Sequence, residues 1–285
     1  MKRFSLVVSS LFVFLFLALT ARAGTIPITD LYVNPSAVAP GSPEVGPFTT
    51  FAFYDETRSI AYAPSIEEIT VGTVFNDHGY GMVYQLRDEN NNVISAPGLG
   101  EDWTFWVEWD ITTKVENISS VPTGDSYTLS FSSGSLDVWL ATADGSFGTD
   151  PAPTDDIVPK ELVKVISATV EPDSSWGYLI SDQNKENFFR NLTVVFIPSF
   201  VDTDILSSDS IDLASVSLNL RATEAAASGL SNTSDCGGYP CIESLGGGGS
   251  MAIAAVPEPT AMFLLGSGAA LLFFGVRRFK RRPEA

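Results

Sequence analysis

Residues 103 to 109 read Trp-Thr-Phe-Trp-Val-Glu-Trp, and this stretch decides the fold class. Large apolar residues stand at positions 103, 105, 107 and 109, and Thr104, Trp106 and Glu108 stand between them. A period of two is typical of a β-strand with one face against a core and the other toward solvent. We therefore predict a strand here, with Trp106 on the face opposite the dense apolar one.

The same alternation continues along the body of the chain. Further strands are predicted over residues 81–87, 127–132, 136–141, 161–170, 192–197 and 216–220. Clusters of Asn, Asp, Ser and Gly separate them, and the cluster at 132–135 predicts a hairpin turn. A strong helical period of 3.6 residues is missing from this region. We predict an all-β fold, a jelly-roll-like β-sandwich over residues 24–227, as one unit or as two subdomains.

The charge of the body limits its partners. Residues 24–257 contain 8 of the 16 Lys and Arg and 32 of the 34 Asp and Glu, a formal net charge of −24. Phosphate binding requires clustered cations, so nucleic acid is excluded as a partner. The acidity instead favours solubility and contact with cations or a basic surface.

Residues 1–23 have the features of a secretory signal peptide. Lys2 and Arg3 precede an apolar run from Phe4 to Leu19, and Ala21 and Ala23 form a small-x-small cleavage pattern before Gly24. The alternative is an N-terminal membrane anchor that is never cleaved. We expect a mature chain that starts near Gly24 outside the cytoplasm.

Residues 228–255 are rich in Gly, Ser and Ala, with Gly246–Ser250 reading Gly-Gly-Gly-Gly-Ser. Such a composition is typical of a flexible linker. We therefore predict a linker between the body and the C-terminal segment.

The C-terminal segment predicts a membrane-spanning helix over residues 260–276. This range holds only Thr, Ser, Gly and apolar residues, and it is close to the length that spans a bilayer. A basic tail follows, which orients the C-terminus toward the cytoplasm; its cations are Arg277, Arg278, Lys280, Arg281 and Arg282. Before the helix, Pro257-Glu258-Pro259 predicts a stiff, extended segment that a protease can bind.

The arrangement from Val256 to Arg282 resembles the PEP-CTERM sorting signal of Gram-negative bacteria. Val256, Pro257, Glu258 and Pro259 supply the motif, and a short apolar helix and a basic tail follow it in the family's order. The resemblance implies an inner-membrane-tethered precursor, recognition by an exosortase, removal of helix and tail, and export to the cell surface or extracellular matrix. A simple tail anchor is the alternative.

The body also resembles the flocculation-associated members of the PEP-CTERM group. The likeness lies in its length, in the strand-rich order around residues 103–109 and 135–140, and in the terminal Ala-Val-Pro-Glu-Pro. It implies a non-enzymatic, structural role in binding cells to extracellular polysaccharide, in a biofilm or a floc. A carbohydrate-binding or calcium-dependent adhesion module is the alternative function, and a secreted hydrolase is a third.

A hydrolase would have to use His78, the single histidine of the chain. Catalysis would pair it with Asp77 or a serine, but the chain has no Gly-x-Ser-x-Gly elbow. We therefore expect a polar loop histidine and no enzyme.

Cys236 and Cys241, the two cysteines of the chain, favour a local disulfide in an oxidising compartment. Zinc would need two more ligands, which one histidine cannot supply. A thioredoxin-type site requires two intervening residues, and here four intervene.

Asp202, Asp204 and Asp209 are close in sequence and offer carboxylates to calcium. They do not match the EF-hand loop, and solvated loop carboxylates are the alternative. No other cofactor is expected.

Exposed aromatic residues on a sheet face can stack against sugar rings. Trp106 is the best candidate, together with Tyr54, Tyr80 and Tyr84, and core packing is the alternative for each.

Overall fold

The computed structural model describes residues 25–142 and 160–256. Residues Pro27–Ala254 form one compact unit. The other unit consists of residues 1–26 and 255–285, of which residues 25, 26, 255 and 256 are described. The side chains whose geometry is described below all lie in Pro27–Ala254.

The described residues are almost entirely strands, with three single turns of 3-10 helix. The strands are β1 (Ile26–Pro27), β2 (Leu31–Val33), β3 (Val45–Phe48), β4 (Thr50–Ala61), β5 (Val74–Arg87), β6 (Trp103–Val121), β7 (Gly124–Thr142), β8 (Lys160–Val170), β9 (Trp176–Ser181), β10 (Asn187–Val201), β11 (Leu206–Ser208), β12 (Ser217–Cys236) and β13 (Tyr239–Val256). The helical turns are η1 (Pro35–Ala37), η2 (Ile66–Glu68) and η3 (Pro172–Ser174). The prediction of an all-β fold is confirmed.

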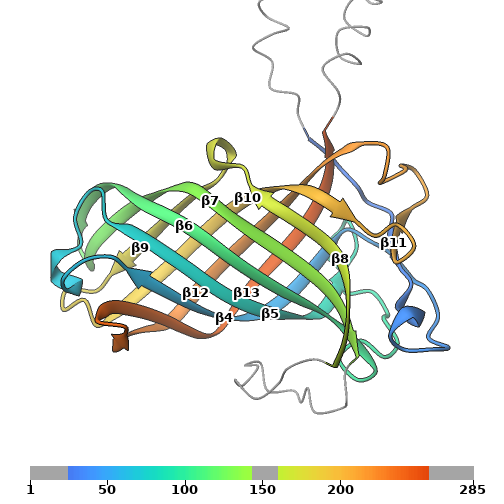
Figure 1. Ribbon diagram of the computed structural model, residues 1–285, viewed down its shortest axis with the longest axis horizontal. Coiled ribbons are helices and arrows are strands. Elements are labelled where there is room, and N and C mark those ends of the chain that lie inside the picture. The colour runs from blue at the N-terminus through green and yellow to red at the C-terminus, as the bar shows by residue number, and fades with distance from the viewer. Residues whose placement is uncertain (1–24, 143–159, 257–285) are drawn as a thin grey trace, which may run out of the picture. The chain divides into compact units, whose positions relative to one another are not determined.

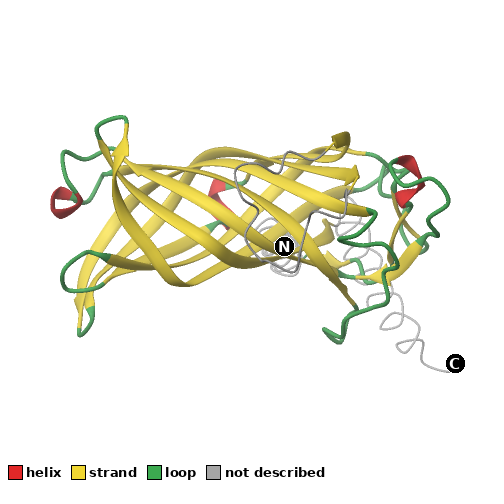
Figure 2. Ribbon diagram, turned by 90° about the horizontal axis from the view of Figure 1, so that it is seen from below, coloured by secondary structure: helices red, strands yellow, loops and turns green. Residues whose placement is uncertain are grey.

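The large sheet closes on itself. Its strands follow the order β1-β13-β12-β10-β8-β7-β6-β5-β4, and β13 also pairs with β4. That pairing is antiparallel and runs from Cys241 opposite Ile60 to Ala252 opposite Thr50. Figures 1 and 2 show long strands that cross obliquely around a common interior. The arrangement thus differs from a sandwich of two separate sheets, although both bury one face of each strand.

Strands β8 and β9 both lie between β7 and β10 in the large sheet, at opposite ends of these two strands. β8 pairs with one end of β7 and of β10, and β9 pairs with the other ends of the same two strands. Between them lies η3, where the Oγ of Ser175 accepts a hydrogen bond from the backbone N–H of Val195 at 2.9 Å. A separate small sheet has the order β11-β2-β3.

The core lies within the closed sheet and follows the predicted alternation. Trp103, Phe105, Val107 and Trp109 of β6 point inward and belong to one continuous apolar cluster. Glu108, between them, is exposed. Burial of these large side chains is the main stabilising contribution to the fold.

The predicted hairpin at residues 132–135 is wrong, because β7 is continuous through them. β7 pairs with β6 from Gly124 opposite Val121 to Thr142 opposite Trp103. Gly134 has a φ of 157°, and a Cβ there would lie 2.5 Å from the backbone oxygen of Asp110. The Ser and Gly residues thus mark an irregularity within one strand, not its end.

The predicted linker over residues 228–255 is also wrong, since the backbone there belongs to β12 and β13. Two of its glycines face a crowded interior. A Cβ on Gly249 would overlap the ring of Phe53, and one on Gly247 would lie 2.8 Å from Oδ1 of Asp55. Glycine here admits neighbouring side chains, and it does not make the segment flexible.

We expect Gly249→Ala to lower the free energy of unfolding by about 1 to 3 kcal/mol, because the added methyl group overpacks the interior at Phe53. Gly248→Ala is the matched control. A Cβ at Gly248 would come no closer than 3.9 Å to its nearest neighbour, so the change should stay within about 0.5 kcal/mol. Urea denaturation of both variants measures the difference. Equal stabilities would indicate a linker after all.

Candidate functional site

A group of charged side chains lies inside the closed sheet. Nη1 of Arg190 on β10 donates to Oδ1 of Asp77 on β5 at 2.9 Å and to Oγ of Ser59 at 2.8 Å. Nε of Arg190 donates to Oε1 of Glu224 on β12 at 3.2 Å, and Nη2 contacts the same oxygen. Together with Asp55 on β4, these three ionisable residues form what we call the buried charge cluster.

Asp55 is the member of the cluster with an unusual proton affinity. Burial raises its pKa to about 8, and the negative charge of Glu224 adds to the effect, against the opposing charge of Arg190. Its Oδ2 accepts from Oγ1 of Thr57 at 3.0 Å, whereas the buried Oδ1 has no donor among the described residues. A protonated Asp55 removes this conflict, because its carboxyl group can then donate to Glu224.

Arg190 stays charged in this environment. Burial lowers its pKa, but the charges of Glu224 and Asp77 outweigh burial and raise the pKa above its usual value. All four side chains of the cluster are buried. The arrangement therefore joins β4, β5, β10 and β12 to one another and presents no free charge to a ligand.

The outer face of β4, β5 and β6 carries an aromatic band, formed by Tyr54, Tyr80, Tyr84 and Trp106. Tyr54 stacks on Tyr84 with ring centroids 4.0 Å apart, and Tyr80 stacks on Trp106 at 5.1 Å. Trp106 lies on the predicted face, and its Nε1 donates to Oε1 of Glu108 at 2.9 Å. However, the side chain is only 6% exposed, because its ring is covered by its neighbours. The band offers a sugar little free ring surface at Trp106.

A second aromatic surface, which the sequence reasoning missed, lies on the outer face of the paired strands β9 and β10. Trp176 is 49% exposed, Tyr178 37% and Phe189 47%. We call these three residues the exposed strip. The alternation in Trp176–Ser181 is visible in the sequence, but it does not indicate which face is outside.

His78 lies on the outer face of β5 and is exposed. Its Cα partners in the flanking strands are Arg58 and Asp110. Asp77 precedes it directly and therefore points to the opposite face, into the buried charge cluster. The structure does not bring the two residues of the hydrolase hypothesis together.

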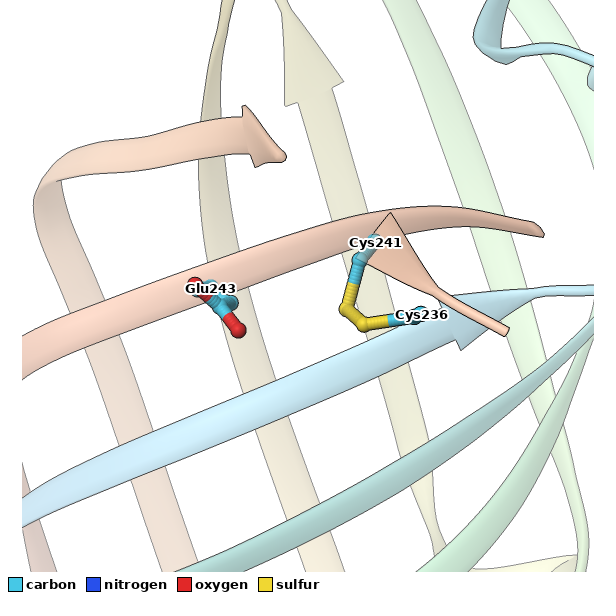
Figure 3. A group of neighbouring side chains, drawn as sticks. All are labelled: Cys236, Cys241 and Glu243. Carbon is cyan, nitrogen blue, oxygen red and sulfur yellow. A yellow bond between two sulfur atoms is a disulfide. The ribbon is translucent and has the colours of Figure 1, made fainter. Parts of the chain in front are cut away.

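Cys236 and Cys241 form a disulfide, with Cα atoms 5.7 Å apart, across the turn at Gly237 and Gly238. Glu243 lies beside it (Figure 3). Within the described ranges, these three are the group of His, Cys, Asp or Glu side chains whose ligand atoms fall within 4.8 Å of one another. Metal binding by cysteine requires thiolates, which a disulfide lacks. Oε1 of Glu243 already pairs with Nε of Arg58 at 2.7 Å.

The calcium candidates do not form such a group in the part of the chain that is described. Oδ1 of Asp202 accepts from the backbone N–H of Asp204 at 3.0 Å, as in a solvated turn. Asp209 lines an open cavity of about 400 Å³ next to β11.

Several predicted features lie outside the described residues. They are the cleavage site at Ala21 and Ala23, the sorting residues Pro257, Glu258 and Pro259, the helix 260–276, and the basic tail from Arg277 to Arg282. Val256 is described as the last residue of β13. Over residues 25–142 and 160–256, no helix combines the length and apolar character needed to cross a membrane.

Comparison with known families identifies one motif. Residues 255–282 match the model of the PEP-CTERM protein-sorting motif. This confirms the predicted sorting signal and indicates an exosortase-targeted protein, made as a membrane-anchored precursor that is exported and processed. No curated protein and no solved structure matches the chain.

Proposed function

We propose that this exosortase substrate is a non-enzymatic protein of the extracellular polysaccharide matrix, where it takes part in biofilm or floc formation. The observation that carries the proposal is the position of the sorting motif. It covers residues 255–282, and the last strand, β13, ends at Val256. Cleavage just after β13 would release the entire closed sheet from the membrane helix.

The assignment of a structural rather than an enzymatic role is supported by the chemistry of the ionisable residues. His78 and Asp77 point to opposite faces of β5. The buried carboxyl groups of the cluster are engaged with Arg190 and with one another. A general acid or base must instead reach a substrate.

Replacing both Pro257 and Pro259 by Ala should block processing, because the extended segment before the helix then becomes able to join it. We expect the variant to stay in the membrane fraction at its precursor mass, while the wild-type protein appears outside the cell without its basic tail. Intact-mass measurement checks this. A tryptic digest does not, since the sequence has no Lys or Arg between Arg221 and Arg277.

Pro122→Ala serves as the control, because Pro122 is exposed and far from the motif in sequence. Cells that lack the chain should lose flocculation, and the Pro122 variant and His78→Ala should both restore it. Failure of His78→Ala to restore flocculation would favour an enzyme. Export of a full-length P257A/P259A chain would contradict the processing step.

Carbohydrate binding as a module is the second candidate function, and the exposed strip favours it. Calcium-dependent adhesion has less support, since the carboxylates of Asp202, Asp204 and Asp209 do not converge within the described residues.

A further inference from the structure

We propose that the exposed strip of Trp176, Tyr178 and Phe189 binds an uncharged polysaccharide chain along the outer face of β9 and β10. This inference rests on the proposed function, because it requires an exported protein that meets polysaccharide. It differs from the sequence-based expectation, which assigned sugar stacking to Trp106.

The strip has the length and the direction of an extended polymer. Trp176 and Tyr178 lie two residues apart on the same face of β9, which separates them by about 7 Å. Ile180 continues this row, and Phe189 of β10 stands opposite it. From Trp176 to the level of Phe189 the row is about 14 Å long, enough for neighbouring sugar units to lie on successive side chains.

The rings of the strip have free surface, unlike those of the aromatic band. Between one third and one half of each side chain is exposed. In the band, Tyr80 and Trp106 stack on each other with an interplanar angle of 15°, so each covers a ring face of the other. Flat aromatic surface that loses little conformational entropy is suited to stacking against the apolar face of a sugar.

Uncharged polar side chains border the strip on both sides. Thr128 of β7 is exposed and Asn191 of β10 is half-buried, and both are Cα partners of Tyr178. A sugar can use such groups, since it presents hydroxyl groups around an apolar ring face. A lipid surface or an apolar partner would instead bury them without hydrogen bonds, which costs free energy.

The charges of the molecule select an uncharged polymer. β9 itself contains no charged residue. The body as a whole has a formal charge of −24. That charge repels both an anionic polysaccharide and a second copy of the chain.

The test uses exported wild-type protein and exopolysaccharide from the producing cells, separated by anion exchange into an uncharged and an anionic fraction. We expect wild-type protein to co-sediment with the uncharged fraction, and the double variant Trp176→Ala, Tyr178→Ala to bind about tenfold more weakly or worse. Tyr62→Ala with Tyr239→Ala is the matched control. These two residues are 49% and 44% exposed, and their rings contact each other at 5.1 Å, away from the strip.

Each outcome decides the assignment once circular dichroism shows that both double variants are folded. Weaker binding by the strip variant alone supports the site. Unchanged binding by that variant, or no wild-type binding to the uncharged fraction, overturns the site but leaves the matrix role intact. If the wild-type protein is a dimer, and the strip variant is a monomer that binds polysaccharide as well as the wild type does, then the strip is a self-association surface. This result would also overturn the proposed polysaccharide site. Retention of wild-type protein inside the cell would instead contradict the proposed function itself.

Discussion

Arg190→Met should lower the free energy of unfolding by about 3 to 5 kcal/mol, the largest effect expected from a single substitution in this protein. Methionine fills similar space, so the loss comes from charge. Without the guanidinium, Asp77 and Glu224 remain buried next to each other with no cation to compensate them. Chemical denaturation at neutral pH measures the change.

Arg58→Met provides the control for this prediction. Arg58 also forms an ion pair, with Glu243 at 2.7 Å, but its side chain is 59% exposed. An exposed pair contributes at most about 1 kcal/mol. Similar losses in the two variants would show that the buried charge cluster is not what Arg190 stabilises. Adding Glu224→Gln to Arg190→Met should recover part of the loss, because the two residues are in direct contact.

The second large effect is a fall in stability as pH rises from 5 to 8. The pKa of Asp55 is about 8 in the folded protein and near 4 when the chain is unfolded, so the folded state holds the extra proton between these values. Stability decreases with pH wherever the folded state binds more protons. The contribution is therefore complete below pH 4 and is lost as pH approaches 8, an effect on the order of a few kcal/mol.

Other carboxyl groups act in a different pH range. Hydrogen bonds from Asn92 lower the pKa of Asp88, and hydrogen bonds from Asn187 lower that of Asp182. Groups of this kind stabilise the fold above pH 4 and lose their contribution only as pH falls further. The protonation of Asp88 and Asp182 does not change between pH 5 and 8, so a slope in that range is attributed to Asp55.

Asp55→Asn tests the assignment, since the amide keeps the shape of a protonated carboxyl and cannot ionise. We expect its stability to vary much less than that of the wild type over this range, in thermal unfolding at several pH values. A wild-type profile that is flat, or a variant with the same slope, would contradict a protonated Asp55.

Strands such as β6 and β10 were predictable because their signal is local, whereas β4, β9 and β13 were not predicted. In Trp103–Trp109 the large apolar residues at every second position all point inward into the core, as the period of two predicts, although Thr104 and Trp106 on the other face are buried as well. The closure of the sheet has no local signal. It depends on the pairing of Thr50–Ala61 with Tyr239–Val256, which are far apart in sequence. Both a sandwich and a closed sheet require the same alternation, so the pattern could not distinguish them.

The glycines were misread for a physical reason. A run such as Gly246–Gly249 suggests flexibility when only composition is considered. In the fold, the absence of a side chain makes room for Phe53 and Asp55, which belong to a strand nearly two hundred residues earlier. Gly134 is a second example, since its role depends on the backbone of Asp110.

The buried charge cluster had a signal that could have been used. Arg190 stands in phase with Phe188, Leu192 and Val194, the inward-facing apolar residues of β10. A charged residue in such a position predicts a buried partner. Which partners it meets could not be predicted, because Asp55, Asp77 and Glu224 come from three other strands. The sorting signal, by contrast, is a contiguous motif, and it was recognised from sequence alone.

The pairing of β4 with β13 also determines when the molecule can become complete. A chain is made and exported from its N-terminus, so β4 must wait for almost the whole remaining sequence before its second neighbour arrives. Any product that stops short of Tyr239 would leave β4 and β12 as open edges, which readily pair with other chains. Successful assembly is therefore tied to arrival of the same end of the polypeptide that carries the sorting motif, and incomplete chains should appear as aggregates rather than as smaller soluble forms.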